Sequence, residues 1–395
     1  MTQPPPRICI LGGGFGGLYT ALRLSQFPWS RPPQIDLVDH NSHFLFTPLL
    51  YELVTGELQA WEIAPPFCEL LANTGIRHVQ AVFEGLDLDQ QVVYLSQGKT
   101  LTYDRLVFAL GGETPLHQVP GAADHAFLFR TVADAYRLEE QLRILEGSPT
   151  DHIRVAIVGA GPSGVELACK LADRLGERGR LRLIDRGDQI LPSAPRFNQA
   201  AARKALDARE VWIDLNTTVK QLEADQIALI YKDQVDTLPV DLVLWTVGTA
   251  ITEVIRQLPL PHHDQGQLRT DVTLQVSDHP DLFALGDLIH CQDAQGQWVP
   301  KTAQAALQQA DCVGWNLWAS LSDRPLLPFR YTALGEMLTL GQDAAALAGL
   351  GLELDGPLAY LARRLIYLYR MPRLEHQLKV GLNWILKPLL SAVTD

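Results

Sequence analysis

The stretch RICILGGGFGGLYTALRL, residues 7–24, decides the fold, because an apolar strand, a glycine cluster and a helical pattern follow one another in it. Gly12, Gly14 and Gly17 have the spacing G-x-G-x-x-G. In dinucleotide-binding units the first glycine permits a tight turn, the second admits a pyrophosphate, and the third lets helix and strand pack closely. Asp39 ends the next apolar strand, 22 residues after Gly17, where an acidic residue accepts hydrogen bonds from a ribose. The stretch therefore predicts a parallel α/β sheet that binds a dinucleotide.

A second stretch, IRVAIVGAGPSGVELACKLADRL, repeats the arrangement. Gly159, Gly161 and Gly164 follow its strand, and Asp185 comes 21 residues after Gly164. Two matches with such similar acid spacings indicate two dinucleotide sites rather than two unrelated packing turns.

Composition limits the class of protein. At 395 residues the chain has room for two to three domains, and its 47% hydrophobic content is enough for packed cores. Its net charge of −12 argues against a nucleic-acid-binding protein, which needs a basic surface. The five cysteines show neither C-x-x-C nor metal-ligand spacing, so we expect reduced thiols and no metal site. They are Cys9, Cys68, Cys169, Cys291 and Cys312.

Two absences bear on localisation. The first strand begins by about residue 8, which leaves no room for a signal peptide. No run of about 18 apolar residues predicts a membrane-spanning helix. The sequence therefore predicts a chain that is made and kept in a bacterial-type cytoplasm.

The positions of the later strands predict an interrupted first module. Apolar strands end at Gly111, Gly248 and Gly286, and Asp287 follows the last of these glycines. This order of strands disfavours two domains that follow one another along the chain. It favours an α/β fold with two Rossmann-like dinucleotide-binding domains, the second inserted in the first. The predicted parts are 1–116 and 265–329 for the first domain, 117–264 for the second, and 330–395 for a C-terminal region.

Several stretches resemble a known family, the two-dinucleotide-binding-domain flavoproteins, and within it the type II NAD(P)H:quinone oxidoreductases. The stretches are HFLFTPLLYELVTGEL (43–58), FALGD (283–287) and PKTAQAALQQADCVGWNL (300–317). The tail LARRLIYLYRMPRLEHQLKVGLNWILKPLL (361–390) is similar to one subgroup, the cyanobacterial and plastid demethylnaphthoquinone reductases linked to phylloquinone biosynthesis.

The resemblance implies that FAD binds the first motif, with Asp39 at its adenosine ribose and Asp287 near its ribityl chain, and that NAD(P)H binds the second motif. It also implies that a hydride passes from the nicotinamide to FAD and that two electrons pass to a membrane quinone, such as the naphthoquinone demethylphylloquinone, without proton pumping. The cofactor-binding residues that it implies are Gly12, Gly14, Phe15, Gly16, Gly17, Asp39, His40, Val82, Ala109, Gly111, Gly159, Gly161, Pro162, Ser163, Gly164, Asp185, Arg186, Gly248, Gly286, Asp287, Ala303 and Gln304.

Two neighbouring residues bear on the choice of hydride donor. The carboxylate of Asp185 accepts hydrogen bonds from the 2′-hydroxyl of NADH and repels the 2′-phosphate of NADPH. The guanidinium of Arg186 can instead pair with that phosphate. The sequence favours NADH and leaves the use of both donors open.

Three side chains are candidates for catalysis. Glu166 lies in the first turn of the second motif's helix, where the resemblance places it near nicotinamide and flavin with a part in relaying protons to the quinone. The alternative is that it complements the helix dipole. Gln304 and Gln308 share one helical face, from which their amides would orient a flavin carbonyl or a quinone oxygen. The alternative for this pair is a solvated polar face.

The C-terminal tail has the character of a membrane-surface helix. Residues 357–395 hold six basic and two acidic residues, a net charge of +4. A cationic, amphipathic segment is typical of an interfacial anchor, whereas the alternative is a helix that covers the core. We expect a peripheral protein on the cytoplasmic face of a bacterial plasma or thylakoid membrane. The predicted apolar face holds Leu374, Leu378, Gly381, Leu382, Ile385 and Leu389, and the opposite face His376, Lys379, Asn383 and Lys387.

Other functions remain as alternatives. A dithiol flavoenzyme needs a redox cysteine pair that the sequence lacks, and a sulfide:quinone oxidoreductase uses paired cysteines around the flavin. A nucleotide-sensing flavoprotein, whose output is a binding event, is compatible with the sequence. No calcium-binding loop pattern is present. The identity of the quinone and the oligomeric state, with a homodimer as one alternative, stay open.

Overall fold

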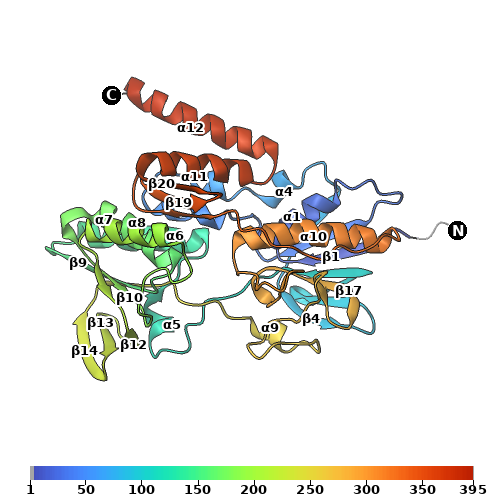
Figure 1. The fold of residues 1–395 in the computed structure, drawn as a ribbon, viewed down its shortest axis with the longest axis horizontal. Coiled ribbons are helices and arrows are strands. Elements are labelled where there is room, and N and C mark those ends of the chain that lie inside the picture. The colour runs from blue at the N-terminus through green and yellow to red at the C-terminus, as the bar shows by residue number, and fades with distance from the viewer. Residues whose placement is uncertain (1–3, 395) are drawn as a thin grey trace. The chain divides into compact units, whose positions relative to one another are not determined.

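The computed structural model describes residues 4–394, with side chains for residues 4–386. The chain forms two compact units, each built from three segments (Figure 1). The first unit comprises Met1–Leu45, Ala64–Glu113 and Thr249–Thr332, and the second comprises Phe46–Ile63, Thr114–Gly248 and Ala333–Asp395. This division differs from the predicted boundaries, because the second unit takes in residues 46–63 and also the C-terminal region.

The first unit is built on a six-stranded sheet in the order β16-β17-β7-β1-β2-β3. All neighbouring pairs except β16–β17 are parallel, and Ala284 of β17 pairs with Phe108 of β7. Helices α1 and α10 pack together beside this sheet (Figure 1). The elements are β1 (Arg7–Leu11), α1 (Phe15–Leu24), β2 (Gln34–Asp39), α4 (Phe67–Leu70), β3 (Ile76–Gln80), β4 (Phe83–Asp87), β5 (Val92–Leu95), η2 (Ser96–Gly98), β6 (Lys99–Thr102), β7 (Arg105–Phe108), α9 (Glu253–Arg256), β16 (Gln275–Val276), β17 (His279–Ala284), η4 (Gly286–Leu288) and α10 (Ala303–Leu321).

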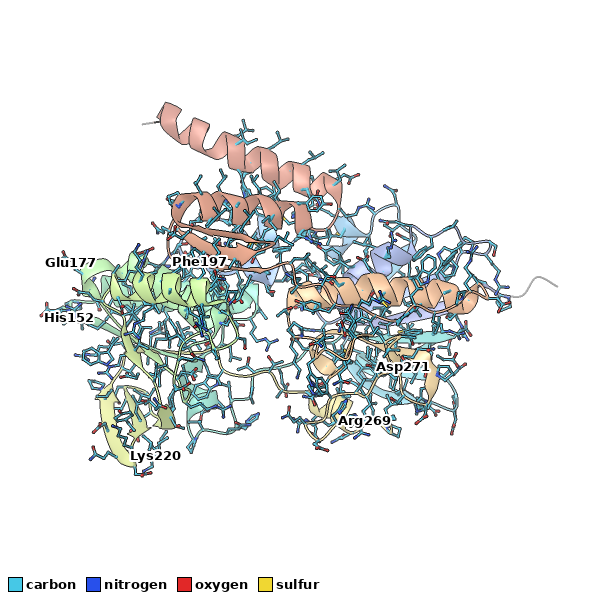
Figure 2. The ribbon with its side chains drawn as sticks, in the orientation of Figure 1. His152, Glu177, Phe197, Lys220, Arg269 and Asp271 are labelled. Atoms are coloured by element: carbon cyan, nitrogen blue, oxygen red, sulfur yellow. The ribbon has the colours of Figure 1, made fainter. Side chains whose placement is uncertain are left out.

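The loop before β16 shows how polar side chains shape this unit. Asp271, labelled in Figure 2, accepts hydrogen bonds from the backbone N–H groups of Thr273 and Gln275. The amide of Asn316, in α10, donates to the backbone carbonyl of Thr273. Hydrogen bonds within the turn and to α10 therefore fix its conformation and the position at which β16 joins the sheet.

The second unit contains a five-stranded parallel sheet in the order β11-β10-β9-β15-β8. The antiparallel sheet β12-β13-β14 packs on it, and side chains such as Ile184, Leu229 and Trp245 form the buried core between them. The elements up to residue 248 are η1 (Thr47–Leu49), α2 (Tyr51–Val54), α3 (Ala60–Ile63), α5 (Ala122–His125), β8 (Ala126–Phe127), α6 (Val132–Gly147), β9 (Ile153–Val158), α7 (Pro162–Leu175), η3 (Gly176–Arg178), β10 (Gly179–Ile184), α8 (Arg196–Asp207), β11 (Trp212–Asp214), β12 (Thr217–Leu222), β13 (Gln226–Tyr231), β14 (Gln234–Pro239) and β15 (Leu242–Trp245).

The segment of residues 46–63 follows β2 in sequence but packs in the second unit. Its helix α2 contacts α6 and α7. Leu49, Leu53, Val54 and Ile63 are buried, which fits the apolar character of this stretch. The segment therefore brings its polar side chains to the helix of the second glycine motif.

The C-terminal region completes the second unit. Strands β18 (Glu336–Thr339), β19 (Ala345–Gly349) and β20 (Leu352–Asp355) form an antiparallel sheet. Helix α11 (Gly356–Arg370) packs on β19 and β20, and α12 (Leu374–Thr394) follows it (Figure 1). Among the described residues, no helix is long and apolar enough to cross a bilayer.

Candidate functional site

The first glycine motif forms a cradle at the end of β1. A Cβ on Gly12 would lie 2.3 Å from the carbonyl oxygen of Ala109, and one on Gly17 would lie 1.8 Å from that of Gly12. A Cβ on Gly14, in contrast, would meet no atom within 4 Å. Gly12 and Gly17 are therefore required by packing, whereas Gly14 leaves open backbone at the start of α1, which fits a pyrophosphate at a helix N-terminus.

Asp39 lies beside this cradle at the end of β2. Its Oδ2 accepts a hydrogen bond from the Gly13 N–H at 2.6 Å, and its Oδ1 accepts one from the Asn41 N–H at 2.8 Å. The backbone thus fixes the carboxylate next to the motif. Each carboxylate oxygen has a second lone pair, which suits acceptance from ribose hydroxyl groups.

The second motif repeats this geometry in the second unit. A Cβ on Gly164 would lie 1.8 Å from the carbonyl oxygen of Gly159, and one on Gly161 would meet nothing within 4 Å. Asp185 Oδ2 accepts from the Ala160 N–H, and Oδ1 accepts from the Gly187 N–H, both at 2.7 Å. The two units therefore carry cradles of the same geometry.

The turn after β17 depends on a residue that the sequence analysis missed. Gly286 has a φ of +81°, and its N–H donates to Gln309 Oε1 at 2.8 Å. Gln309 lies on α10 and is only 2% exposed. The signal that identifies it is an amide on an apolar helical face, since Ala305, Ala306 and Val313 are its buried neighbours. Gln309 therefore holds the turn that contains Asp287.

Gln304 and Gln308 both bind the segment that follows α10. Gln304 Oε1 accepts from the Tyr331 hydroxyl at 3.0 Å. Gln308 donates to the Thr332 carbonyl at 2.8 Å and accepts from the Thr332 N–H at 2.9 Å. The pair lies on one helical face, and in this structure its amides hold residues 331–332. A role toward flavin or quinone stays a prediction.

The other predicted binding residues flank the two cradles in sequence. In the first unit Gly16 and Ala109 are buried, whereas His40 and Val82 are exposed. Gly111 and Gly248, which follow β7 and β15, both have positive φ. The remaining members are Phe15 and Ala303 at the starts of α1 and α10, Pro162 and Ser163 at the start of α7, and the exposed Arg186 after β10.

Glu166 lies in a buried charged cluster of the second unit. The Glu166 side chain is 6% exposed on α7, and its Oε1 accepts from the Thr339 N–H at 2.9 Å. Arg363, from α11, is fully buried with Nη2 3.7 Å from Glu166 Oε1. Its Nη1 donates to Glu52 Oε1 at 2.5 Å, and its Nη2 donates to the Pro48 carbonyl at 2.7 Å. The guanidinium of Arg363 thus forms ion pairs with two buried carboxyl groups, those of Glu52 and Glu166.

Burial changes the acidity of Glu166. Loss of water raises its pKa to about 7, and the charge of Glu52 acts in the same direction. Arg363 and the Thr339 N–H oppose this rise because they stabilise the carboxylate. A carboxyl group of this kind exchanges a proton near neutral pH, as general acid–base catalysis requires.

A second buried ion pair lies one helical turn along α7. The Lys170 ammonium donates to Glu57, and the Tyr360 hydroxyl donates to the other oxygen of Glu57 at 3.0 Å. Arg364 donates to the Tyr360 hydroxyl at 3.0 Å. Glu52, Glu57, Lys170 and Arg363 were not among the predicted site residues. Acidic residues within an otherwise apolar segment and a lysine four residues after Glu166 are the signals present in the sequence.

Helix α12 attaches to the unit through the face that holds His376, Asn383 and Trp384, and Val380 is also fully buried. The ring of His376 hydrogen-bonds to the Glu62 carbonyl at 2.8 Å, and Asn383 and Trp384 donate to Glu62 Oε1. The apolar face points away from the protein, since Leu378 is 57% exposed. Leu374, Leu382 and Ile385 are exposed to a similar degree. Lys379, predicted on the polar face, is exposed, and Gly381, predicted on the apolar face, is half-buried. Lys387 and Leu389 lie outside the described side chains.

The chain is similar to a known family and to named proteins. Residues 6–310 match the family described as pyridine nucleotide-disulphide oxidoreductase. Demethylphylloquinone reductase NdbB of Synechocystis sp. is 56% identical over 98% of both chains. Alternative NAD(P)H-ubiquinone oxidoreductase C1 of Arabidopsis thaliana is 43% identical over 98% of this chain and 82% of its own.

The fold resembles solved structures at low sequence identity. NDH2 from Plasmodium falciparum in complex with NADH superposes with a TM-score of 0.86 at 18% identity, covering 97% of this chain and 98% of that chain. The sulfide:quinone oxidoreductase of Aquifex aeolicus superposes with a TM-score of 0.78 at 19% identity, covering 92% of this chain and 90% of that chain. Both comparisons describe the α/β dinucleotide-binding architecture.

Proposed function

Because the chain belongs to the pyridine nucleotide-disulphide oxidoreductase family and, within it, to the type II NAD(P)H:quinone oxidoreductases, we propose that it moves two electrons from NAD(P)H through FAD to a membrane naphthoquinone such as demethylphylloquinone. The observation that carries this proposal is the pair of matching cradles, each with open backbone at its middle glycine and a fixed acidic side chain. The name of the Synechocystis relative supports the naphthoquinone.

We assign FAD to the first unit and NAD(P)H to the second. When bound, FAD accepts a hydride from the nicotinamide and gives two electrons to the quinone. The chain's own residues bind and orient these groups. Backbone at Gly14 and Gly161 receives the pyrophosphates, and Asp39 and Asp185 accept hydrogen bonds from ribose hydroxyl groups. Gln309 holds the turn that presents Asp287.

We assign Glu166 the role of proton carrier for quinone reduction. Its pKa of about 7 lets it hold a proton at neutral pH and release it without a large energetic cost. The carboxylate that remains is stabilised by Arg363 and by the Thr339 N–H. Gln304 and Gln308 complete the proposed catalytic set as amides that orient the reacting carbonyl oxygens.

We further propose that α11 and α12 attach the protein to a membrane surface as a peripheral protein. A helix that covered the core would turn its apolar face inward, whereas the polar face of α12 lies against Glu62 and its leucines are exposed. The apolar side chains Leu358, Leu361, Leu365 and Tyr369 of α11 are also exposed. Apolar surface flanked by basic residues is typical of interfacial helices.

The test of the proposed function is flavin content followed by a quinone series. The purified protein should hold one non-covalent FAD and should reduce naphthoquinones with NADH or NADPH, and sulfide should not replace the donor. Gly14→Val should lose the flavin, because the side chain fills the space for the pyrophosphate. Full retention of the flavin in this variant, or no quinone reduction by the holoenzyme, would contradict the proposal.

A further inference from the structure

A buried tyrosine reaches the first turn of the second motif's helix. The hydroxyl of Tyr51, in α2, lies 2.9 Å from Ser163 Oγ, although the two residues are 112 positions apart. The Tyr51 side chain is 8% exposed, and its ring packs on Phe129 with centroids 5.5 Å apart. Packing therefore fixes the position of the Tyr51 ring and, with it, the position of the hydroxyl group beside Ser163.

The direction of this hydrogen bond matters. Tyr51 donates and the Ser163 oxygen accepts. A serine hydroxyl has one proton of its own and two lone pairs, so Ser163 keeps a proton to donate elsewhere. Burial and the charge of Glu166 raise the pKa of Tyr51 well above its usual range. Tyr51 therefore keeps its hydroxyl proton and can donate it throughout the working pH range.

Ser163 lies in the first turn of α7, where the proposed function places the pyrophosphate of the nicotinamide dinucleotide. It is the second residue of α7 and follows Gly161, whose neighbourhood is open. Pro162 has no N–H, so the donors of this first turn are the N–H groups of Ser163 and Gly164 and the hydroxyl of Ser163. A side-chain donor is valuable here because proline has removed a backbone donor.

We propose that Tyr51 is a positioning residue for the nicotinamide dinucleotide: by donating to Ser163 it turns the serine proton toward the pyrophosphate. The inference rests on the proposed function, because it takes the second motif to be the NAD(P)H site. It assigns to residues 46–63 a part in nucleotide binding, although these residues follow the strand that ends at Asp39.

The test is binding of ADP-ribose to the holoenzyme by calorimetry. ADP-ribose has the pyrophosphate but no nicotinamide, so it reports on this contact without turnover. Tyr51→Phe should weaken binding about 3- to 10-fold, as expected for one hydrogen bond. The KM for NADH should rise by a similar factor while kcat stays unchanged. Tyr136→Phe, the same change at an exposed tyrosine of α6, should bind as the wild type does.

A double variant shows whether Tyr51 acts through the serine. Ser163→Ala alone should weaken ADP-ribose binding at least as much as Tyr51→Phe does. In the Ser163→Ala background, Tyr51→Phe should have no further effect. Wild-type affinity in either single variant, or effects that multiply in the double variant, would overturn the inference. Wild-type holoenzyme that neither binds ADP-ribose nor oxidises NADH would contradict the proposed function itself.

Discussion

Arg363 Nη1 donates to Glu52 Oε1 at 2.5 Å across 311 positions of sequence, and both side chains are buried. This contact joins α11 to the segment of residues 46–63 beside Glu166. Because Arg363 is the guanidinium nearest both buried carboxyl groups, its loss would remove the cation that pairs with Glu52 and lies 3.7 Å from Glu166.

We therefore expect Arg363→Met to lower the free energy of unfolding by about 3–5 kcal/mol, as is typical when one partner of a buried ion pair is removed. Arg143, paired with Glu139 on the surface of α6, is 72% exposed. Arg143→Met should cost less than about 1 kcal/mol. Urea unfolding of both variants checks the contrast, and equal losses would show that the buried pair is no more important than the surface pair.

Glu166 should give the activity a pH dependence. With a folded-state pKa of about 7, the proton that we assign to quinone reduction is present below pH 7 and lost above it. The kcat with a quinone should therefore fall as pH rises through about 7. Glu166→Gln should remove this step and lower kcat roughly 100-fold. Glu177→Gln, at an exposed position (Figure 2), should keep the wild-type profile.

The same pKa predicts a stability profile. Between the ordinary value of 4.5 and about 7, the folded state holds a proton on Glu166 that the unfolded chain has lost. The contribution of Glu166 to stability is therefore fully present below pH 4.5 and falls as pH rises toward 7. The free energy of unfolding of the wild type minus that of Glu166→Gln, measured as a function of pH, isolates this contribution. If this difference rises between pH 4.5 and 7, the pKa assigned to Glu166 is wrong.

Asp39 and Asp185 form a matched pair for testing which cradle holds which nucleotide. Asp185→Asn keeps one of the two oxygens that accept from the Ala160 and Gly187 N–H groups and removes the charge that repels a 2′-phosphate. It should raise the KM for NADH and shift preference toward NADPH. Asp39→Asn should instead weaken FAD retention and leave donor preference unchanged. Kinetics with both donors and flavin release measure the two effects, and an exchange of outcomes would reverse the assignment.

The exposed face of α12 should determine membrane binding. Replacing Leu378, Leu382 and Ile385 with serine should reduce co-sedimentation with anionic liposomes without lowering thermal stability, because these side chains are already exposed. Each basic residue near the membrane surface should add about 1 kcal/mol to the free energy of binding, and salt should weaken this attraction. Ile144→Ser with Val235→Ser, at exposed positions elsewhere in the unit, is the control. Unchanged binding of the α12 variant contradicts the membrane proposal.

Surface substitutions test the tail better than truncation does. Deleting the chain from Gly356 removes Arg363 and His376, which are buried in the second unit. The truncation would also remove the guanidinium that pairs with Glu52 and lies beside Glu166. A loss of activity could then result from either impaired folding or lost membrane attachment.

The parts of the fold that local backbone geometry requires could be predicted from the sequence. Gly12 and Gly159 adopt positive φ, and Gly17 and Gly164 have no room for a Cβ, so the motif spacing alone identifies both cradles. Asp39, which ends β2, and Asp185, which directly follows β10, are placed beside the glycines by the length of the strands. These features lie within about 30 residues of each other in sequence, where spacing translates directly into geometry.

The buried charged cluster could not be predicted, because its partners come together only through tertiary packing. Nothing near Glu52 in sequence indicates an arginine 311 positions later. Helical periodicity did place His376 and Asn383 opposite the leucines of α12. It could not show that this polar face meets Glu62 while the leucines face outward, since periodicity gives the two faces but not their neighbours.

The three-segment construction of the second unit sets an order of events during synthesis. Glu52 and Glu166 leave the ribosome well before Arg363, and at roughly 5–20 residues per second the delay after Glu166 is about 10–40 s. Throughout this interval the nascent nucleotide-binding sheet carries carboxyl groups that its final packing buries beside a cation. The buried ion pairs that Arg363 makes in this unit can therefore form only after α11 has been synthesised.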